Sequence, residues 1–361
     1  MLAAAASWAG LALLWAAGGC AGDAGGYRRR VSLEYNPGWA SPDVNLLHTR
    51  AVGVNDTLHY VWSTIGVPTV LLVYTASDNS SLRVNWTRLL SSSPAGAIWI
   101  EPAGSVLYST APGWAAERNG AQRRLPGLQP RRHLWQREHL FQAYEEGSRD
   151  GILPCLLHSA NSSKVEFTME GVAPRGNRSR FALEILVVEE GSRRKQLQSA
   201  LSIDDEYTPT IFEMAQLTSE PHNHSLGSSF LQWKTAAYNS KTPHRQNTVH
   251  CQYYPLQAIR TLGPEFRILR AYFGEDVEHR CSLSALNISF GSEDNEANRE
   301  KRYLSWSALV GFGEPPREGF SVLVIGILAV ALGAPAVLLI VGSLAVLTRQ
   351  QKPCSQYEPI N

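Results

Sequence analysis

Cysteine is scarce in this sequence. The 361 residues include five cysteines, and only Cys155, Cys251 and Cys281 lie away from the two ends of the chain. Small secreted domains depend on dense disulfide frameworks, which three cysteines cannot form, so a hydrophobic core must provide most of the stability. We expect Cys251 to pair with Cys281, which leaves Cys155 as an odd thiol.

A surplus of positive charge is also missing. Lysine and arginine number 33 against 32 aspartate and glutamate residues, which gives a formal net charge of +1 at neutral pH. Proteins that bind nucleic acids carry a strongly basic surface that neutralises phosphates. The charge balance therefore indicates that nucleic acid is not a partner.

Motifs of the common enzyme classes are absent as well. The sequence has no nucleophile elbow, zinc-protease histidine pair, phosphate-binding glycine loop or dinucleotide fingerprint. One acidic cluster remains a candidate, because Asp204, Asp205 and Glu206 can bind a hard cation or act as an acid and a base. Neighbouring residues on an extended chain point to opposite sides, which favours a solvated acidic turn instead.

A second cluster, His222 and His224, resembles a metal-binding pair. Asn223 between them lies in a glycosylation motif, which indicates an exposed loop, and no third ligand follows nearby. We therefore expect no catalytic residue, no metal site and no cofactor in this protein.

Glycosylation motifs, in contrast, are abundant. Seven Asn-x-Ser/Thr motifs occur among fifteen asparagines, where chance predicts about two. The acceptors are Asn55, Asn79, Asn85, Asn161, Asn177, Asn223 and Asn287. The excess indicates a surface made in the secretory pathway. Apolar and polar residues alternate in Leu82–Thr87 and Leu286–Phe290, which predicts strands that turn Asn85 and Asn287 outward.

Short strand-like runs dominate the long middle part of the chain. Clusters of Gly, Pro, Asn and Ser separate them, and no long amphipathic helix is evident. This pattern predicts an all-β, sandwich-type architecture with one large domain or two lobes. The predicted strands are Val31–Tyr35, Thr57–Trp62, Thr69–Tyr74, Leu82–Leu89, Ile98–Ile100, Lys164–Met169, Phe181–Val188, Phe230–Tyr238, Phe266–Phe273, Leu286–Phe290 and Tyr303–Val310.

Residues 111–150 do not fit this pattern. The segment contains seven arginines and no Val, Ile or Thr, and it has no glycosylation motif. Three interpretations remain open. The segment is a basic loop for an anionic partner, a disordered linker between two lobes, or an aberrant segment such as a splicing artefact.

The two ends of the chain predict a membrane topology. Residues 1–21 resemble a signal peptide, with an apolar run followed by small residues before the predicted cleavage after Ala21. Phe320–Leu347 is a run of 28 residues without charge, which is long enough to cross a bilayer. Arg349 and Lys352 follow it, so the positive-inside rule places the tail in the cytosol. This is the topology of a type I single-pass protein.

The tail ends in a tyrosine followed three residues later by a bulky aliphatic residue, Tyr357 and Ile360. Adaptors that sort proteins to endosomes and lysosomes read this arrangement close behind a membrane span. We therefore expect a sorting signal that clathrin adaptors bind.

Several strings in order along the chain carry a family resemblance. They are Asn45–His48, Leu58–Trp62, Ser81–Thr87, Pro174–Ser179, Ser202–Tyr207, Tyr303–Ser307, and the span with its tail ending Ile360-Asn361. The sequence resembles the glycosylated lysosomal membrane protein family over about residues 30–102 and 152–361. Residues 111–150 depart from the family pattern, as does the lack of expected cysteines near Ser163 and Arg194.

The resemblance implies a type I lysosomal membrane glycoprotein without enzymatic activity. It also implies an accessory subunit that stabilises a lysosomal major-facilitator transporter and shields it from lumenal proteases. The predicted parts are a signal peptide (1–21), a lumenal glycosylated β domain (22–319), a transmembrane helix (320–347) and a cytosolic tail (348–361). The alternative is a lumenal hydrolase or glycan-binding protein that uses the acidic cluster at residues 204–206.

Overall fold

The computed structural model describes most of the chain between the predicted signal peptide and the tail. The described residues are 27–41, 43–116, 140–171, 181–191, 193–204, 210–221, 227–291, 302–317 and 322–350. One compact unit, the β domain, comprises Gly26–Ser202 and Phe212–Arg317, and a second unit contains the C-terminal helix. The predicted β domain is therefore one large domain.

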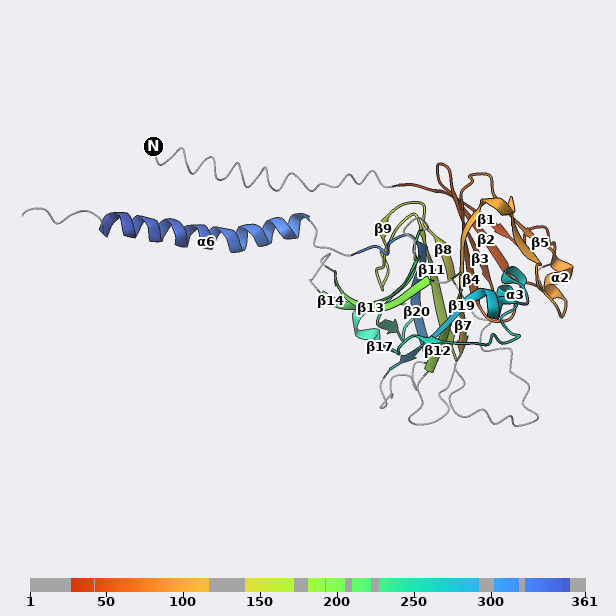
Figure 1. Ribbon diagram of the computed structural model, residues 1–361. Coiled ribbons are helices and arrows are strands. Elements are labelled where there is room, and N and C mark those ends of the chain that lie inside the picture. Colours follow the sequence, from red (N-terminus) through yellow and green to blue (C-terminus); the bar gives the residue numbers. More distant parts are fainter. Residues whose placement is uncertain are drawn as a thin grey trace, which may run out of the picture. The chain divides into compact units, whose positions relative to one another are not determined.

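The β domain is built on one long, curved sheet, whose first half runs through eight strands (Figure 1). All neighbouring pairs in this half are antiparallel. In spatial order the strands are β1 (Arg30–Tyr35), β2 (Leu46–Val52), β3 (Thr57–Ser63), β4 (Thr69–Thr75), β7 (Val106–Ala116), β12 (Phe181–Glu190), β19 (Cys281–Phe290) and β17 (Thr248–Tyr253).

The second half of the sheet joins the first through the short strand β16 (Ala236–Tyr238), which pairs with both β17 and β20. Its strands are, in spatial order, β8 (Leu140–Ala143), β11 (Ser162–Glu170), β20 (Tyr303–Phe312), β15 (Ser229–Lys234), β14 (Thr210–Pro221) and β13 (Arg193–Asp204). The chain therefore forms a sandwich whose two layers are halves of one sheet.

The inner core lies between the two halves and is rich in tryptophan. Trp62 and Trp114 come from the first half, and Trp233 and Trp306 from the second, and all four are at most 3% exposed. Tryptophan buries a large area, and tilted ring pairs add to the stability of a core. Trp233 and Trp306 form such a pair, with centroids 6.2 Å apart. A core of this size can stabilise the domain without a disulfide framework.

A second core covers the outer face of the first half. Strand β3 shows how both cores arise, because Tyr60 faces the inner core and its neighbour Val61 faces the outer one. The outer layer consists of α2 (Trp86–Leu90), α3 (Arg267–Phe273), α4 (Val277–Arg280), β5 (Ser81–Val84) and β6 (Ile98–Glu101). Figure 1 shows α2, α3 and β5 grouped beside β1 to β4.

Two of the predicted strands are wrong in part or entirely. Phe266–Phe273 is not a strand, because Arg267–Phe273 forms the helix α3. Its buried residues are Ile268, Leu269, Ala271 and Phe273. The burial of the adjacent residues Ile268 and Leu269 in one core fits a helix, because neighbours on a strand point to opposite faces. The predicted strand Leu82–Leu89 stops at Val84, after which α2 begins.

Both ends of the basic segment 111–150 belong to the β domain. Residues 111–116 complete β7, where Trp114 is fully buried. Residues 140–143 form β8, and the short strands β9 (Ser148–Arg149) and β10 (Leu157–His158) make a hairpin after it. The described parts of the segment are therefore structured, and residues 117–139 lie outside the described residues.

The second unit contains one long helix, α6 (Val322–Gln350). Its stretch Ile325–Thr348 has a mean hydropathy of 2.5 and none of its most apolar window is buried. By length and composition this helix can cross a membrane, which agrees with the predicted span. Residues 318–321 and the tail with Tyr357 and Ile360 lie outside the described residues.

Candidate functional sites: glycan acceptors and buried polar clusters

Two of the predicted glycan acceptors lie in exposed connections between strands. Asn55 lies in the hairpin between β2 and β3, and Asn79 lies between β4 and β5. Both side chains are exposed, and surface loops are where oligosaccharides are attached. The fold therefore gives both asparagines the access that a glycan needs.

Asn85 is also exposed, but it does not lie on the predicted strand. It is the N-cap of α2, and its Oδ1 accepts a hydrogen bond from the backbone N–H of Arg88 at 3.0 Å. Asparagine is favoured at N-caps because this bond satisfies an otherwise unpaired amide. A glycan is attached through Nδ2, so Oδ1 can still cap the helix when the sugar is present.

Asn161 is a half-buried acceptor with structural contacts. Its Oδ1 accepts from Arg29 Nε at 2.7 Å, and its backbone oxygen accepts from Tyr60 Oη at 2.7 Å. Arg29 is only 3% exposed and also binds both oxygens of Asp56. Asn161 therefore joins the start of β1 to the turn before β11, a role independent of any glycan.

Asn287 lies in the central strand β19 and is half-buried, so its predicted outward exposure is only partial. Leu286, Ile288 and Phe290 are buried, as the alternation predicts, but Ser289 is also covered, at 5% exposed. The cover is the segment after β17, where Tyr254 Oη lies 3.3 Å from Ser289 Oγ. Within the described residues Asn287 Oδ1 has no hydrogen-bond partner. Asn177 and Asn223 lie outside the described residues.

The predicted disulfide between Cys251 and Cys281 is wrong. Both cysteines have free thiols. Cys251 pairs across the sheet with Phe290 at one end of β19, and Cys281 is the first residue at the other end of that strand. Nine residues of strand separate these ends by about 30 Å, whereas a disulfide needs Cα atoms within about 7 Å. Sequence spacing could not reveal that the strand keeps them apart.

Neither thiol has the character of a nucleophile. Burial raises the pKa of Cys251 well above its usual value, and burial together with Glu190 raises the pKa of Cys281 to about 11. The thiolate is the reactive form of cysteine. Both side chains therefore remain protonated at neutral and acidic pH.

A buried chain of hydrogen bonds links two histidines and a serine beneath the outer face of the sheet. His48 Nε2 lies 3.0 Å from His59 Nδ1, and His59 Nε2 lies 2.8 Å from Ser80 Oγ. Ser80 Oγ is in turn 2.7 Å from Thr75 Oγ1, and Glu34 lies 3.9 Å from the outer nitrogen of His48. Adjacent imidazoles pointing toward a hydroxyl resemble the parts of a nucleophilic triad.

The environment of this chain opposes catalysis. Burial lowers the pKa of His48 to about 4, and burial together with the nearby His48 and Arg50 lowers the pKa of His59 to about 3. His59 and Ser80 are 0% exposed, so a substrate cannot reach the hydroxyl in this structure. The histidines are instead neutral core residues, and three of their four ring nitrogens take part in the hydrogen bonds of this chain.

A second polar cluster centres on Glu189, a fully buried carboxylate in β12. Its oxygens accept from Tyr108 Oη and from Ser219 Oγ. Lys195 Nζ lies 3.7 Å away, and the Arg193 guanidinium stacks over the Tyr108 ring at 3.9 Å. A buried charge is tolerated only when it is paired and hydrogen-bonded, and this one is.

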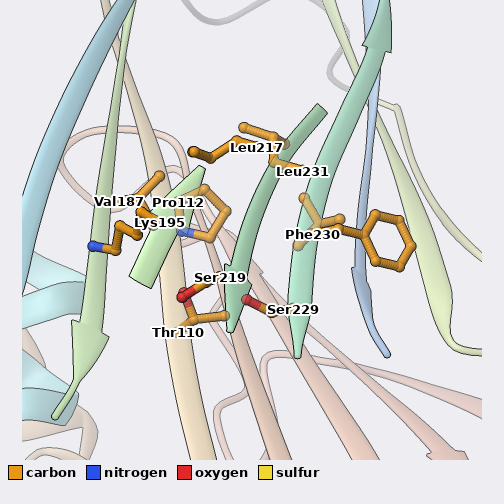
Figure 2. Close-up of a pocket in the computed structure, with 10 residues that line it drawn as sticks. Thr110, Pro112, Val187, Lys195, Leu217, Ser219, Ser229, Phe230 and Leu231 are labelled. Carbon is orange, nitrogen blue, oxygen red and sulfur yellow. The ribbon is translucent and has the colours of Figure 1, made fainter. Parts of the chain in front are cut away.

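A small cavity of about 20 Å³ lies beside this cluster, between β12, β14 and β15. Figure 2 shows the apolar side chains of Val187, Leu217 and Leu231 around it, together with Ser219 and Ser229. Such a volume holds about one water molecule. The cavity is therefore too small for a substrate.

A third cluster lies under the β9–β10 hairpin. Asp150 accepts from Tyr144 Oη at 2.8 Å and from Lys164 Nζ at 2.9 Å, and the His158 ring stacks on Tyr144 with centroids 3.5 Å apart. All four side chains are at most 9% exposed. The cluster ties the hairpin to β11 and offers no open position to a ligand.

The predicted acidic cluster cannot be assembled from the described residues. Asp204 is the last residue of β13, while Asp205, Glu206, His222 and His224 lie outside the described residues. Among the described residues, no group of three His, Cys, Asp or Glu side chains is arranged to hold a metal ion.

Comparison with known proteins identifies the family. The family model for glycosylated lysosomal membrane protein matches residues 45–112 and 136–353. The chain is 45% identical to glycosylated lysosomal membrane protein A of Xenopus laevis over 92% of this chain and 93% of that protein. It is 36% identical to the Homo sapiens glycosylated lysosomal membrane protein, over 92% of this chain and 91% of that protein. The Danio rerio protein is 36% identical over 97% of both chains.

Between its two matched parts the family model leaves residues 113–135 of this chain unmatched. These residues fall within the basic segment 111–150, whereas residues 136–150 are matched. The departure from the family is thus shorter than the sequence alone suggests. With matches over most of the chain and identities well above 30%, the chain belongs to the glycosylated lysosomal membrane protein family.

Proposed function

We propose that this protein is a non-enzymatic type I glycoprotein of the lysosomal membrane. In this role it serves as an accessory subunit that stabilises a major-facilitator transporter and protects it from lumenal proteases. The observation that carries the proposal is a single compact β domain with exposed glycan acceptors, followed in the sequence by one apolar helix. The names of the relatives support the lysosomal membrane.

The exposed acceptors support a protective role. Asn55, Asn79 and Asn85 present their side chains to solvent on three different connections of the first half of the sheet. Hydrated oligosaccharides at these positions obstruct the approach of a protease to the backbone beneath them. A glycan coat that shields this domain also shields the part of a partner that lies against it.

The helix α6 supports a partner within the membrane. Ala329 and Gly333 are four residues apart, and no atom lies near the position that a Cβ of Gly333 would occupy. Small residues at this spacing allow another helix to approach closely. A multi-span transporter offers such helices.

The alternative, a lumenal hydrolase or glycan-binding protein, has less support. The serine and histidines that most resemble a triad are enclosed, and the cavity beside Glu189 accepts about one water molecule. Neither of these two places therefore offers a substrate an open catalytic site.

The proposal is tested by removing the protein from cells and measuring the half-life of candidate transporters. We expect the transporter's half-life to fall while its transcript level is unchanged, and re-expression of the chain to restore it. Re-expressed Asn55→Gln/Asn79→Gln/Asn85→Gln should restore it only partly, because the domain folds but lacks its coat. Unchanged half-lives of all lysosomal major-facilitator transporters would refute the accessory role.

The sorting signal has its own test. Tyr357→Ala should move the protein to the cell surface, whereas the matched change Tyr27→Ala, at an exposed tyrosine of the β domain, should not. Surface biotinylation measures the difference. Equal surface fractions for both variants would show that Tyr357 and Ile360 are not a signal.

A further inference from the structure

Strand β1 forms an open edge of the sheet with apolar side chains exposed. In the described residues it pairs with β2 alone. Leu33 is 65% exposed and Tyr35 is 58% exposed. Both point to the face of the sheet that carries the inner core in the neighbouring strands, because they alternate with Ser32 and Glu34. An uncovered edge strand with apolar residues readily pairs with another strand.

The hydrogen-bond phase of β1 shows which backbone groups are available. Asn36 N–H donates to Leu46 O at 2.8 Å, so Asn36 faces β2. In an antiparallel pair the direction of these bonds alternates along the strand. Arg30, Ser32 and Glu34 therefore face β2 as Asn36 does, while the N–H and C=O groups of Val31 and Leu33 point to the open edge.

We propose that β1 pairs antiparallel with β1 of a second copy of this chain, around a two-fold axis at Ser32. This register places Val31 opposite Leu33 of the partner subunit, with their outward backbone groups hydrogen-bonded. It also places Arg30 opposite Glu34 of the partner subunit, and Glu34 opposite the partner's Arg30. The strand is thus complementary to itself in hydrogen bonding, in apolar character and in charge.

Charge selects this register over its neighbours. In the chosen register the Arg30 and Glu34 pairs are of the kind that is not directly hydrogen-bonded, where Cα atoms lie about 4.5 Å apart and side chains are closest. Opposite charges facing each other there stabilise pairing, and like charges oppose it. A shift of the axis to Glu34 would instead set two carboxylates against each other. A shift to Leu33 would place Glu34 opposite Ser32 and Arg30 opposite Asn36, so neither charge would face an opposite charge.

Neighbouring features limit the pairing to residues 30–34. Arg29 N–H already donates to Glu145 O at 2.9 Å, which ends the open edge on one side. Asn36 has a φ of 46°, which turns the chain away on the other side. Residues 27–54 contain no glycan acceptor, so no oligosaccharide attached within them obstructs the second copy.

A cysteine at the axis provides the test. Ser32 is exposed, and opposite residues of such a pair lie within the Cα range of a disulfide. We expect full-length Ser32→Cys, isolated from membranes, to run as a covalent dimer on a non-reducing gel. Glu34→Cys should not, because Arg30 faces it, whereas Arg30→Cys combined with Glu34→Cys should cross-link again. The parent chain measures the background from its own cysteines.

The alternative outcomes are distinct. The proposed pairing is wrong if Ser32→Cys forms no more covalent dimer than the parent chain. It is also wrong if Glu34→Cys forms as much covalent dimer as Ser32→Cys. If Ser32→Cys cross-links to a different protein instead, β1 binds a partner strand of another chain and the proposal also fails.

Charge exchange provides a second, independent test. Glu34→Arg alone should at least halve the dimeric fraction of detergent-solubilised full-length protein in light scattering, because two arginines then face each other. Arg30→Glu combined with Glu34→Arg restores opposite charges and should restore the dimer. Failure of the double variant to recover, while its circular dichroism matches that of the parent, would overturn the register.

Discussion

Strands β1 and β3 lie in the same sheet, separated only by β2, yet their environments differ completely. All seven residues of β3 are buried, whereas five of the six residues of β1 are exposed. Strand β1 alternates strictly between polar and apolar residues, whereas β3 alternates only as far as Tyr60 and continues with Val61 and Trp62. Strand β3 has a neighbour on each side and a core on each face, while β1 has one neighbour among the described strands. Burial in this sheet is therefore decided by position among the strands.

The largest effect is expected from Trp62 in β3, which is 3% exposed and packs against Trp114 and Phe167. Trp62→Ala removes a core indole and should lower the free energy of unfolding by about 3–5 kcal/mol. Urea denaturation followed by circular dichroism measures it. The control is Trp39→Ala, at a side chain that is 37% exposed, and an equal loss in the two variants would contradict the comparison.

The next effect concerns pH and His59, also in β3. Its pKa is lowered to about 3 in the folded protein, against about 6.5 when unfolded. The unfolded chain therefore binds more protons as the pH falls below 6.5, and stability falls with it. From pH 7 to pH 5 this histidine should cost about 2 kcal/mol.

His59→Gln should reduce this pH dependence by a similar amount, as urea denaturation at the two pH values will show. The control is His244→Gln, at an exposed histidine. If the parent and His59→Gln lose the same stability between pH 7 and pH 5, the histidine is not buried in its neutral form.

A smaller effect of opposite sign is expected in β2, between the two strands. Thr49 is fully buried opposite Leu33, and within the described residues its Oγ1 has no hydrogen-bond partner. Thr49→Val replaces the unpaired hydroxyl by a methyl group of similar shape and should stabilise the fold by about 1 kcal/mol. Thermal unfolding measures the gain, and a decrease in stability would show that the hydroxyl is paired.

The smallest effect on folding is expected at Leu33 in β1. Leu33→Ser should change the free energy of unfolding of the monomer by less than about 0.5 kcal/mol, as is usual for exposed side chains. Urea denaturation at low protein concentration measures it. A loss comparable to that of Trp62→Ala would mean that β1 is covered within the monomer, and the contrast with β3 would disappear.

The pattern of short strand-like runs in the sequence predicted several strands correctly. The expected runs Thr57–Trp62 and Thr69–Tyr74 match β3 and β4 closely. It failed at Phe266–Phe273, where a short apolar run suits a helix as well as a strand. It also failed at Asn85, because the alternation of Leu82, Val84 and Trp86 continues past the end of β5 and does not mark the start of α2.

The buried polar clusters were not predicted because their parts lie far apart in the sequence. Glu189 meets Tyr108 and Ser219, at separations of 81 and 30 residues. In the sequence each is an ordinary polar residue in a strand. The pairing of β7 with β12 and the packing of β14 from the other half of the sheet bring them together, and no local signal indicates either contact.

The sequence by itself determined the class of the protein: a β-rich glycosylated domain, one apolar span and a family resemblance that the comparisons confirm. These features depend on residue type and local spacing. The tertiary structure decided which asparagines are exposed and that β1 lies at an edge of the sheet. It also decided that Cys251, in β17, lies beside one end of β19 while Cys281 lies at the other end. These depend on which distant strands become neighbours, which local sequence does not encode.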